Sequence, residues 1–169
     1  EHPVYSTGKE SLKMVYALIV DDEGGQSVFA SVDGGLDRYV DRIVHVSVKC
    51  VYRAFATAPN DPNGVDTSVL SVALALLHTV SKDDSVVRKL SEQSLAVVFA
   101  SLMSTVIDDR LTIGDEAVNT EIVRCMNVVM IRLSRSRPGR SLCCLVRLLL
   151  RCVKDADISE PPLAPKVCC

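Results

Sequence analysis

The sequence predicts an all-α protein, and three observations support this fold class. Apolar residues recur at helical spacing in segments of about 12 to 23 residues, and no segment alternates with period two for long. Aromatic residues make up only 4% of the chain and Trp is absent, so the core must be aliphatic. Several segments are apolar on more than one face, as expected when a helix packs on two neighbours. We therefore expect about six helices in an α-solenoid of stacked helix pairs, with a compact bundle as the alternative.

Two helices are expected in the first third of the chain. Residues 9–20 carry apolar side chains at helical spacing, and an acidic turn followed by two glycines ends this helix. A short helical turn is expected over 26–32. Residues 36–58 form a longer amphipathic helix. Its apolar surface consists of Leu36, Tyr39, Val40, Ile43, Val44, Val46 and Val51.

Two further helices are expected after the loop at 59–64, which is rich in Pro, Asn and Asp. A side chain among residues 66–68 can cap the first of them, which extends to about Ser81 and is apolar nearly all round. Residues 82–85 form a turn and a cap. A single helix is expected to continue from this turn to about Val106.

The next helix follows a loop at 108–114. Within that loop we interpret the sequence Asp108-Asp109-Arg110 as charge neutralisation or helix capping. Asp115 and Glu116 then open the helix at its positive end. Its apolar face is expected to bury Val118, Ile122, Met126, Val129, Met130 and Leu133.

The last helix is expected after a basic loop at 134–139, with Ser141 as its N-cap and its end near Lys154. Its inward face is expected to consist of Leu142, Leu145, Val146, Leu149, Cys152 and Val153. Three prolines within 155–169 predict a disordered tail or linker. Residues 1–154 are thus predicted to be a single helical-repeat domain. The start at Glu-His-Pro, without Met, indicates a fragment of a longer protein.

Charge is unevenly distributed along the chain. Residues 124–154 contain eight Arg or Lys and no Asp or Glu, whereas the whole chain has a formal net charge of −2. Such asymmetry points to an acidic partner or an acidic neighbouring surface. Three explanations stay open: a solvated polar face, a protein-binding patch, or a nucleic-acid site. Nucleic acid is the least favoured, because the block has no Phe, Tyr or Trp to stack on bases and the rest of the chain is acidic.

The sequence motifs do not indicate catalysis, a cofactor or a metal. The histidines His2, His45 and His78 have no Cys or acid at ligand spacing on one face. The paired glycines belong to no phosphate-binding motif, and no nucleophile elbow occurs. We therefore expect a non-catalytic binding or scaffolding module.

The cysteine pattern favours a reducing compartment. The seven Cys are odd in number and irregular in spacing, which argues against a disulfide framework. We expect Cys125, Cys143 and Cys152 to serve as small apolar core residues. Cys168 and Cys169 are compatible with lipidation or with the end of a fragment, and we favour the fragment. The longest apolar run, 95–107, is shorter than the roughly 20 residues of a membrane span, so no membrane association is expected.

The second half of the chain carries a family pattern. A helix with Leu102-Met103 is followed by the sequence 107–111, an acidic loop and the aliphatic run 122–133. The residues that match the pattern one by one are Arg110, Arg124 and Asn127. Residues 142–149 match the next helix in character. Together these features resemble the C-terminal helical domain of the TOG microtubule-regulator family, which includes the Minispindles and colonic-hepatic TOG proteins.

The resemblance implies an α-solenoid of HEAT- or TOG-like helix pairs and a structural role for Arg110, Arg124 and Asn127 between helices. It also implies a docking module that targets its parent protein to spindle poles, centrosomes or microtubules in the cytoplasm. Tubulin-binding members of the family place a Trp in an inter-helix loop. Because this chain has no Trp, tight binding of tubulin dimers is not expected. The alternative is a generic armadillo- or HEAT-type adaptor with no microtubule role.

One loop departs from the family. The sequence Arg137-Pro138-Gly139-Arg140 stands where the family usually has Ser-Asp or Ala-Asp with a Thr. This change adds to the basic block and makes that surface particular to this chain. The candidate protein-binding residues are therefore Arg135, Arg137, Arg140, Arg147, Arg151 and Lys154.

Overall fold

The computed structural model describes residues 39–56, 64–112 and 115–158, and within these ranges every regular element is helical. The predicted all-α class is therefore confirmed for the described residues. The predicted helix at 9–20 and the turn at 26–32 lie outside them. The elements are α3 (Val40–Ala56), α4 (Thr67–Lys82), α5 (Asp84–Lys89), α6 (Glu92–Val106), the 3-10 turn η2 (Asp109–Thr112), α7 (Glu116–Ser136) and α8 (Pro138–Ile158).

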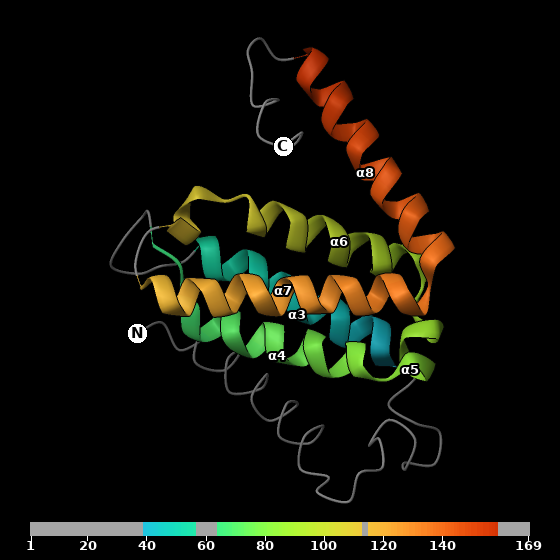
Figure 1. Ribbon diagram of the computed structural model, residues 1–169, viewed down its shortest axis with the longest axis horizontal. Coiled ribbons are helices and arrows are strands. Elements are labelled where there is room, and N and C mark those ends of the chain that lie inside the picture. The colour runs from blue at the N-terminus through green and yellow to red at the C-terminus, as the bar shows by residue number, and fades with distance from the viewer. Residues whose placement is uncertain (1–38, 57–63, 113–114, 159–169) are drawn as a thin grey trace, which may run out of the picture.

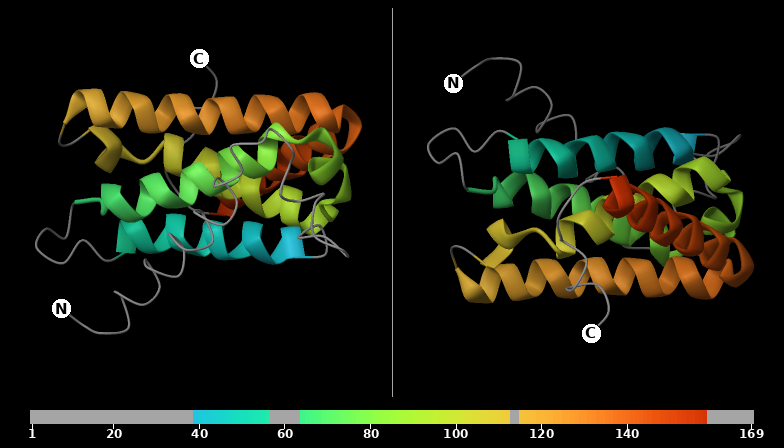
Figure 2. Two further views of the ribbon diagram at one scale, coloured as in Figure 1. Left: turned by 90° about the horizontal axis from the view of Figure 1, so that it is seen from below. Right: turned by 90° about the horizontal axis from the view of Figure 1, so that it is seen from above.

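Two helix pairs lie side by side around one core. Helix α3 packs on α4, α6 packs on α3, and α7 packs on both α4 and α6 (Figure 1). The two views in Figure 2 show α7 and α3 on opposite edges of this group. The bulkiest fully buried side chains are Phe99, Leu70, Leu74, Leu76, Leu90, Leu95, Leu102 and Met126. Helix α8 contacts α6 and α7 near its start and then extends away from the other helices (Figure 1).

Capping side chains decide where most of these helices begin. Asp66, one of the three capping candidates at 66–68, accepts hydrogen bonds from the backbone N–H groups of Ser68 and Val69 at the start of α4. Asp115 does the same for Ala117 and Val118 at the start of α7. Each carboxylate satisfies N–H groups that have no partner within the first turn.

The expected single helix from the turn at 82–85 to Val106 is wrong, because the chain breaks between α5 and α6. Leu90 leaves the helical conformation, Ser91 has extended backbone angles, and the Ser91 hydroxyl accepts from the Ser94 N–H at 3.1 Å to start a new helix. The Ser91 N–H donates to Oδ1 of Asp41 on α3 at 3.0 Å. A contact from a distant helix therefore stabilises the break.

The basic loop expected at 134–139 is also wrong, because α7 continues to Ser136 and α8 begins at Pro138. Pro is favoured in the first turn of a helix, where its missing N–H needs no partner. Ser141 is consequently not an N-cap but a buried residue of the first turn, and its hydroxyl donates to the Leu133 carbonyl at 3.3 Å. At the other end, α8 continues past the expected Lys154 to Ile158.

Candidate docking surface on helix α8

The start of α8 is attached firmly to the rest of the protein. Arg137, only 8% exposed, donates from Nη1 to the carbonyl oxygen of Leu90 at the end of α5. The Ser136 hydroxyl donates to the Asp84 carboxylate on α5. In the second turn of α8, Cys144 is buried among the core residues. The position of α8 is therefore determined by the α7–α8 turn and by the first two turns of the helix.

Along its outer side α8 presents an apolar surface that the described residues do not cover. The apolar stripe, as we call it, consists of Leu142, Val146, Leu149, Leu150 and Val153. These side chains are 44–63% exposed. Every side chain from Leu149 to Lys154 is exposed, in keeping with the extension of this half of α8 away from the bundle in Figure 1. Five large apolar side chains exposed along one helix make this surface a candidate interaction site.

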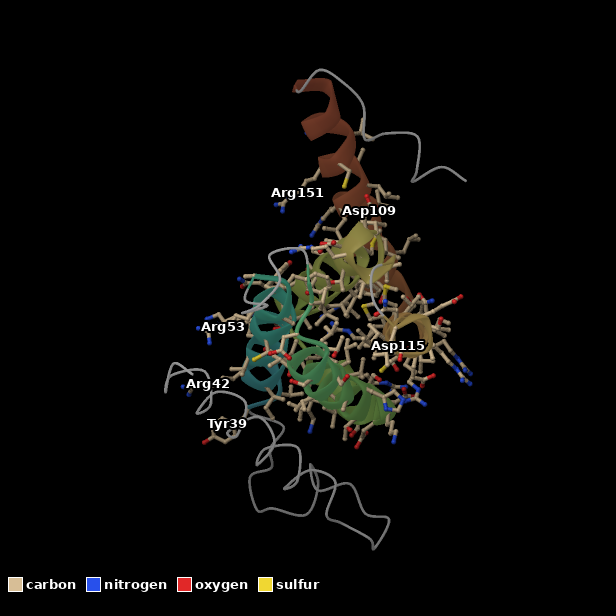
Figure 3. All side chains as sticks on the ribbon, turned by 90° about the vertical axis from the view of Figure 1, so that its left-hand side faces the viewer. Tyr39, Arg42, Arg53, Asp109, Asp115 and Arg151 are labelled. Atoms are coloured by element: carbon tan, nitrogen blue, oxygen red, sulfur yellow. The ribbon has the colours of Figure 1, made fainter. Side chains whose placement is uncertain are left out.

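A basic ridge lies beside the apolar stripe. It consists of Arg140, Arg147, Arg151 and Lys154, all exposed. At 3.6 residues per turn, the stripe has the ridge on one side and the packed face, with Cys144 and Leu148, on the other. Figure 3 shows Arg151 projecting away from α8. Arg140 lies 3.5 Å from Glu92 of α6, whereas the other three form no ion pair with a described side chain.

The expected inward face of α8 is largely wrong. Leu145 is half-buried against the core, but Leu142, Val146, Leu149, Cys152 and Val153 are exposed. The apolar arc of α8 is too wide for a helix that packs on one side only. That width is the signal in the sequence that could have revealed the stripe, since part of the arc needs a second neighbour that the described residues do not supply.

The six candidate protein-binding residues do not share one surface. Arg140, Arg147, Arg151 and Lys154 lie on the ridge, and Arg135 is exposed near the end of α7. The prediction is wrong for Arg137, because its side chain is buried and donates a hydrogen bond to the Leu90 carbonyl oxygen at the end of α5. A guanidinium that already donates inside the protein is not available to a partner.

The residues of the family pattern also separate. Arg124 and Asn127 are exposed on α7, so the expected hydrogen bonds between helices are wrong for the described part of the chain. Arg124 lies 3.7 Å from Glu121 on the same helix, and both side chains are more than 70% exposed. Such a pair contributes little to stability. Of the three family-pattern residues, only Arg110 joins two helices.

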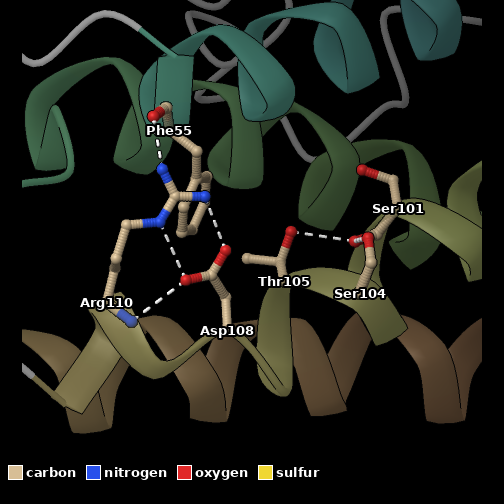
Figure 4. A network of polar contacts seen from close by, with 6 residues as sticks. All are labelled: Phe55, Ser101, Ser104, Thr105, Asp108 and Arg110. Atoms are coloured by element: carbon tan, nitrogen blue, oxygen red, sulfur yellow. Dashed lines mark hydrogen bonds and ion pairs between the residues drawn. The ribbon is translucent and has the colours of Figure 1, made fainter. Parts of the chain in front are cut away.

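Arg110 connects the end of α6 to the end of α3 (Figure 4). Its Nη1 donates to the Phe55 carbonyl oxygen at 2.7 Å. Its Nε and Nη2 donate to the two oxygens of Asp108 at 2.9 and 2.7 Å. The guanidinium also lies 5.0 Å from the centroid of the Phe55 ring. The arginine therefore neutralises Asp108, as the sequence predicts, and satisfies a carbonyl group at a helix C-terminus.

This cluster predicts a loss of stability in acid. The hydrogen bond from Arg110 holds the pKa of Asp108 below its ordinary value, against the opposing effect of burial. Because the folded pKa is the lower one, the stabilisation is present above about pH 4 and is lost as pH falls through the folded pKa. Urea unfolding at pH 7 and pH 3 should therefore show a smaller acid loss for Asp108→Asn than for the unsubstituted protein. Glu121→Gln, which removes an exposed carboxylate that contributes little to stability, is the control, and an equal acid loss in the Asp108 variant would contradict the prediction.

The described histidines lie in structural positions. His45 Nδ1 lies 2.8 Å from the Asp41 carbonyl oxygen. It also lies 3.3 Å from the hydroxyl of Ser94, a fully buried residue of α6. His78 Nε2 accepts from Arg132 of α7 at 3.0 Å. Burial, followed by the charges of Arg132 and Lys82, lowers the pKa of His78. Both rings thus join helices, α3 to α6 and α4 to α7.

The described cysteines are all free. Burial raises the pKa of the Cys50, Cys125 and Cys144 thiols, as expected for small residues packed at the core. Cys143 and Cys152 are exposed, so the expected core role is wrong for these two. Among the described residues, no group of three His, Cys, Asp or Glu side chains could hold a metal ion. No helix in the described ranges is long and apolar enough to cross a membrane.

Comparisons with protein families, with curated proteins and with solved structures find no match for this chain.

Proposed function

We propose that this chain is a non-catalytic protein-docking module and that α8 carries its binding surface. The observation that carries the proposal is the apolar stripe, whose five side chains are 44–63% exposed beside a basic ridge. The firm attachment of the first turns of α8 supports it, because a rigidly positioned helix loses little conformational freedom when it binds.

The proposed architecture is a segment of an α-solenoid of HEAT-like helix pairs. Helices α3 and α4 form one pair and α6 and α7 the next, with α6 against α3 and α7 against α4. Helix α8 lies on α6 in the place where a third pair would start. In a solenoid each pair covers the open face of the one before it. Among the described residues no further helix covers α8.

The finer proposal is that the partner belongs to the microtubule cytoskeleton, at spindle poles, centrosomes or microtubules in the cytoplasm. It rests on the resemblance of residues 95–153 to the C-terminal domain of the TOG regulators. The position of Arg110 supports it, because this family-matching residue joins two helices. The alternative is an adaptor of armadillo or HEAT type without a microtubule role, and the exposure of Arg124 and Asn127 favours that alternative.

Affinity capture with the purified chain tests the proposal. The double variant Leu142→Glu/Leu149→Glu places charges in the stripe, and Ile131→Glu on α7 is a matched control because Ile131 is also exposed, at 57%. We expect microtubule or spindle-pole proteins to be retained by the unsubstituted chain and by the control but lost from the double variant. Retention that the double variant does not change would contradict docking through α8.

Two further outcomes separate the finer alternatives. Proteins that are lost from the double variant but have no link to microtubules would favour the generic adaptor. Because the chain has no Trp, we expect no tight binding of free tubulin dimers. Co-elution of the chain with tubulin dimers at micromolar concentration would contradict this expectation.

A further inference from the structure

We infer that the apolar stripe receives one amphipathic helix of a partner protein, and that this helix carries carboxylates along the edge that faces the basic ridge. The inference rests on the proposed docking function and specifies the chemistry of the ligand.

The spacing of the stripe indicates a helical ligand. Leu142, Val146, Leu149 and Val153 follow one another at intervals of four, three and four residues. This is the interval of a coiled-coil seam, in which side chains of one helix fit between those of another. Leu150 lies beside the seam on the side of the ridge. At about 1.5 Å per residue the seam is about 17 Å long, so three turns of a partner helix would cover it.

The charges indicate the sign and the orientation of the ligand. Arg147, Arg151 and Lys154 lie along one edge of the stripe, whereas the opposite edge adjoins the packed face of α8. A helix seated on the stripe therefore meets positive charge along one edge only. Exposed ion pairs each contribute about 0.2–1 kcal/mol, so the apolar contact supplies most of the affinity. The charges speed association and select one direction of the bound helix.

A second copy of the chain that pairs through its own α8 does not satisfy these charges. Two α8 helices placed stripe to stripe in an antiparallel arrangement would bring their basic ridges close together, and in a parallel arrangement each ridge would face the packed-face edge of the other helix. The exposed side of α3 offers no acidic alternative, because it carries Arg42, Lys49 and Arg53. Figure 3 labels Arg42 and Arg53 on this side. Like charges in contact destabilise an interface. The ridge therefore favours a partner of opposite charge over self-association.

A membrane surface is also less suitable than an acidic helix. Helices that lie in a lipid interface carry basic residues on the polar face and Trp, Phe or Leu on the other. Helix α8 has no aromatic residue. The packed face of α8 adjoins the stripe, so the body of the domain stands beside the stripe and occupies one flank of a membrane placed against it.

A synthetic helix tests the inference on the full chain. The probe is a fluorescein-labelled 21-residue peptide with Leu at alternating intervals of three and four, Glu along one edge, and Ala and Gln elsewhere. It is used at nanomolar concentration to avoid self-association. Fluorescence anisotropy is expected to show saturable binding. A peptide with Lys in place of Glu should bind at least about ten-fold more weakly, because its charges oppose the ridge.

Matched variants locate the binding site. Leu142→Glu and Leu149→Glu should each weaken binding by about ten-fold or more, since each removes a buried apolar contact. Ile131→Glu should leave binding unchanged. Arg147→Glu/Arg151→Glu should weaken binding of the acidic peptide and improve that of the basic one. Arg124→Glu/Arg135→Glu, a double reversal at exposed positions of α7, is the control for net charge.

Several outcomes would overturn the inference. Equal binding of the acidic and basic peptides would remove the role of the ridge. Stripe-dependent binding to vesicles of anionic phospholipid, or stripe-dependent dimers in sedimentation equilibrium, would show a different occupant. Slow amide exchange across residues 149–154 in the free chain would show that another part of the chain already covers the stripe. If the peptide fails while stripe-dependent capture of a protein persists, the inference is wrong but the docking function stands.

Discussion

Phe99→Ala is expected to lower the free energy of unfolding by about 4 kcal/mol, the largest effect of any single substitution proposed for this chain. Phe99 lies on α6, is 1% exposed and heads the fully buried side chains by volume. Helix α6 packs on α3, α7 and α8, so a cavity at Phe99 affects the contacts that hold the two pairs together. With so few aromatic residues, the chain has no other ring of this size among its fully buried side chains in the described ranges.

Urea unfolding followed by circular dichroism measures this loss. Phe99→Leu should cost only about 1–2 kcal/mol, because most of the buried volume is kept. Ile107→Ala is the control at the end of the same helix, where the side chain is 67% exposed, and it should change the stability by less than about 0.5 kcal/mol. A loss below about 1 kcal/mol for Phe99→Ala would contradict the central place of this ring.

Arg137→Ala is expected to cost about 3 kcal/mol, the second largest effect. The substitution leaves the Leu90 carbonyl without its guanidinium donor and removes the packing of a buried side chain. An unsatisfied buried carbonyl costs about 1–3 kcal/mol, and hydrogen bonds to charged groups are among the stronger ones. Because Arg137 joins the α7–α8 turn to the end of α5, its loss should also weaken amide protection in the first turns of α8.

The matched control is Arg135→Ala, two residues earlier in the same basic segment but exposed on α7. It should change the free energy of unfolding by less than about 0.5 kcal/mol. Arg137→Lys should retain only part of the lost stability, because an ammonium group has a different reach and geometry from a guanidinium. Equal effects of the Arg135 and Arg137 substitutions would show that Arg137 is not the structural contact described here.

Some helix boundaries could be predicted from local chemistry. Asp66 and Asp115 were predictable because a capping carboxylate acts on N–H groups two and three residues ahead of it in the chain. Asp108 and Arg110 were predictable as a neutralised pair because they are only two residues apart in the chain. The Phe55 carbonyl that Arg110 also reaches belongs to α3, more than fifty residues away, and no local pattern contains it.

Other features depended on contacts between distant residues. The break at Leu90–Ser91 has a local signal in the capping Ser91 hydroxyl, but its contact with Asp41 of α3 could not be derived from the residues around it. Arg135 and Arg137 are the same residue type two positions apart, yet one is exposed and the other buried. Their difference arises from the direction in which α7 ends, which places Arg137 against the α5 terminus.

The sequence by itself determined that this chain is helical, that its core is aliphatic and that positive charge accumulates between residues 124 and 154. These properties follow from periodicity and composition, which act over a few turns of the chain. Only the tertiary structure decided which parts of the apolar and basic residues are covered. Helix α8 finds neighbours for one side of its wide apolar arc and none among the described residues for the other. Burial depends on where the remaining helices lie, and that position turned an expected core face into a candidate docking surface.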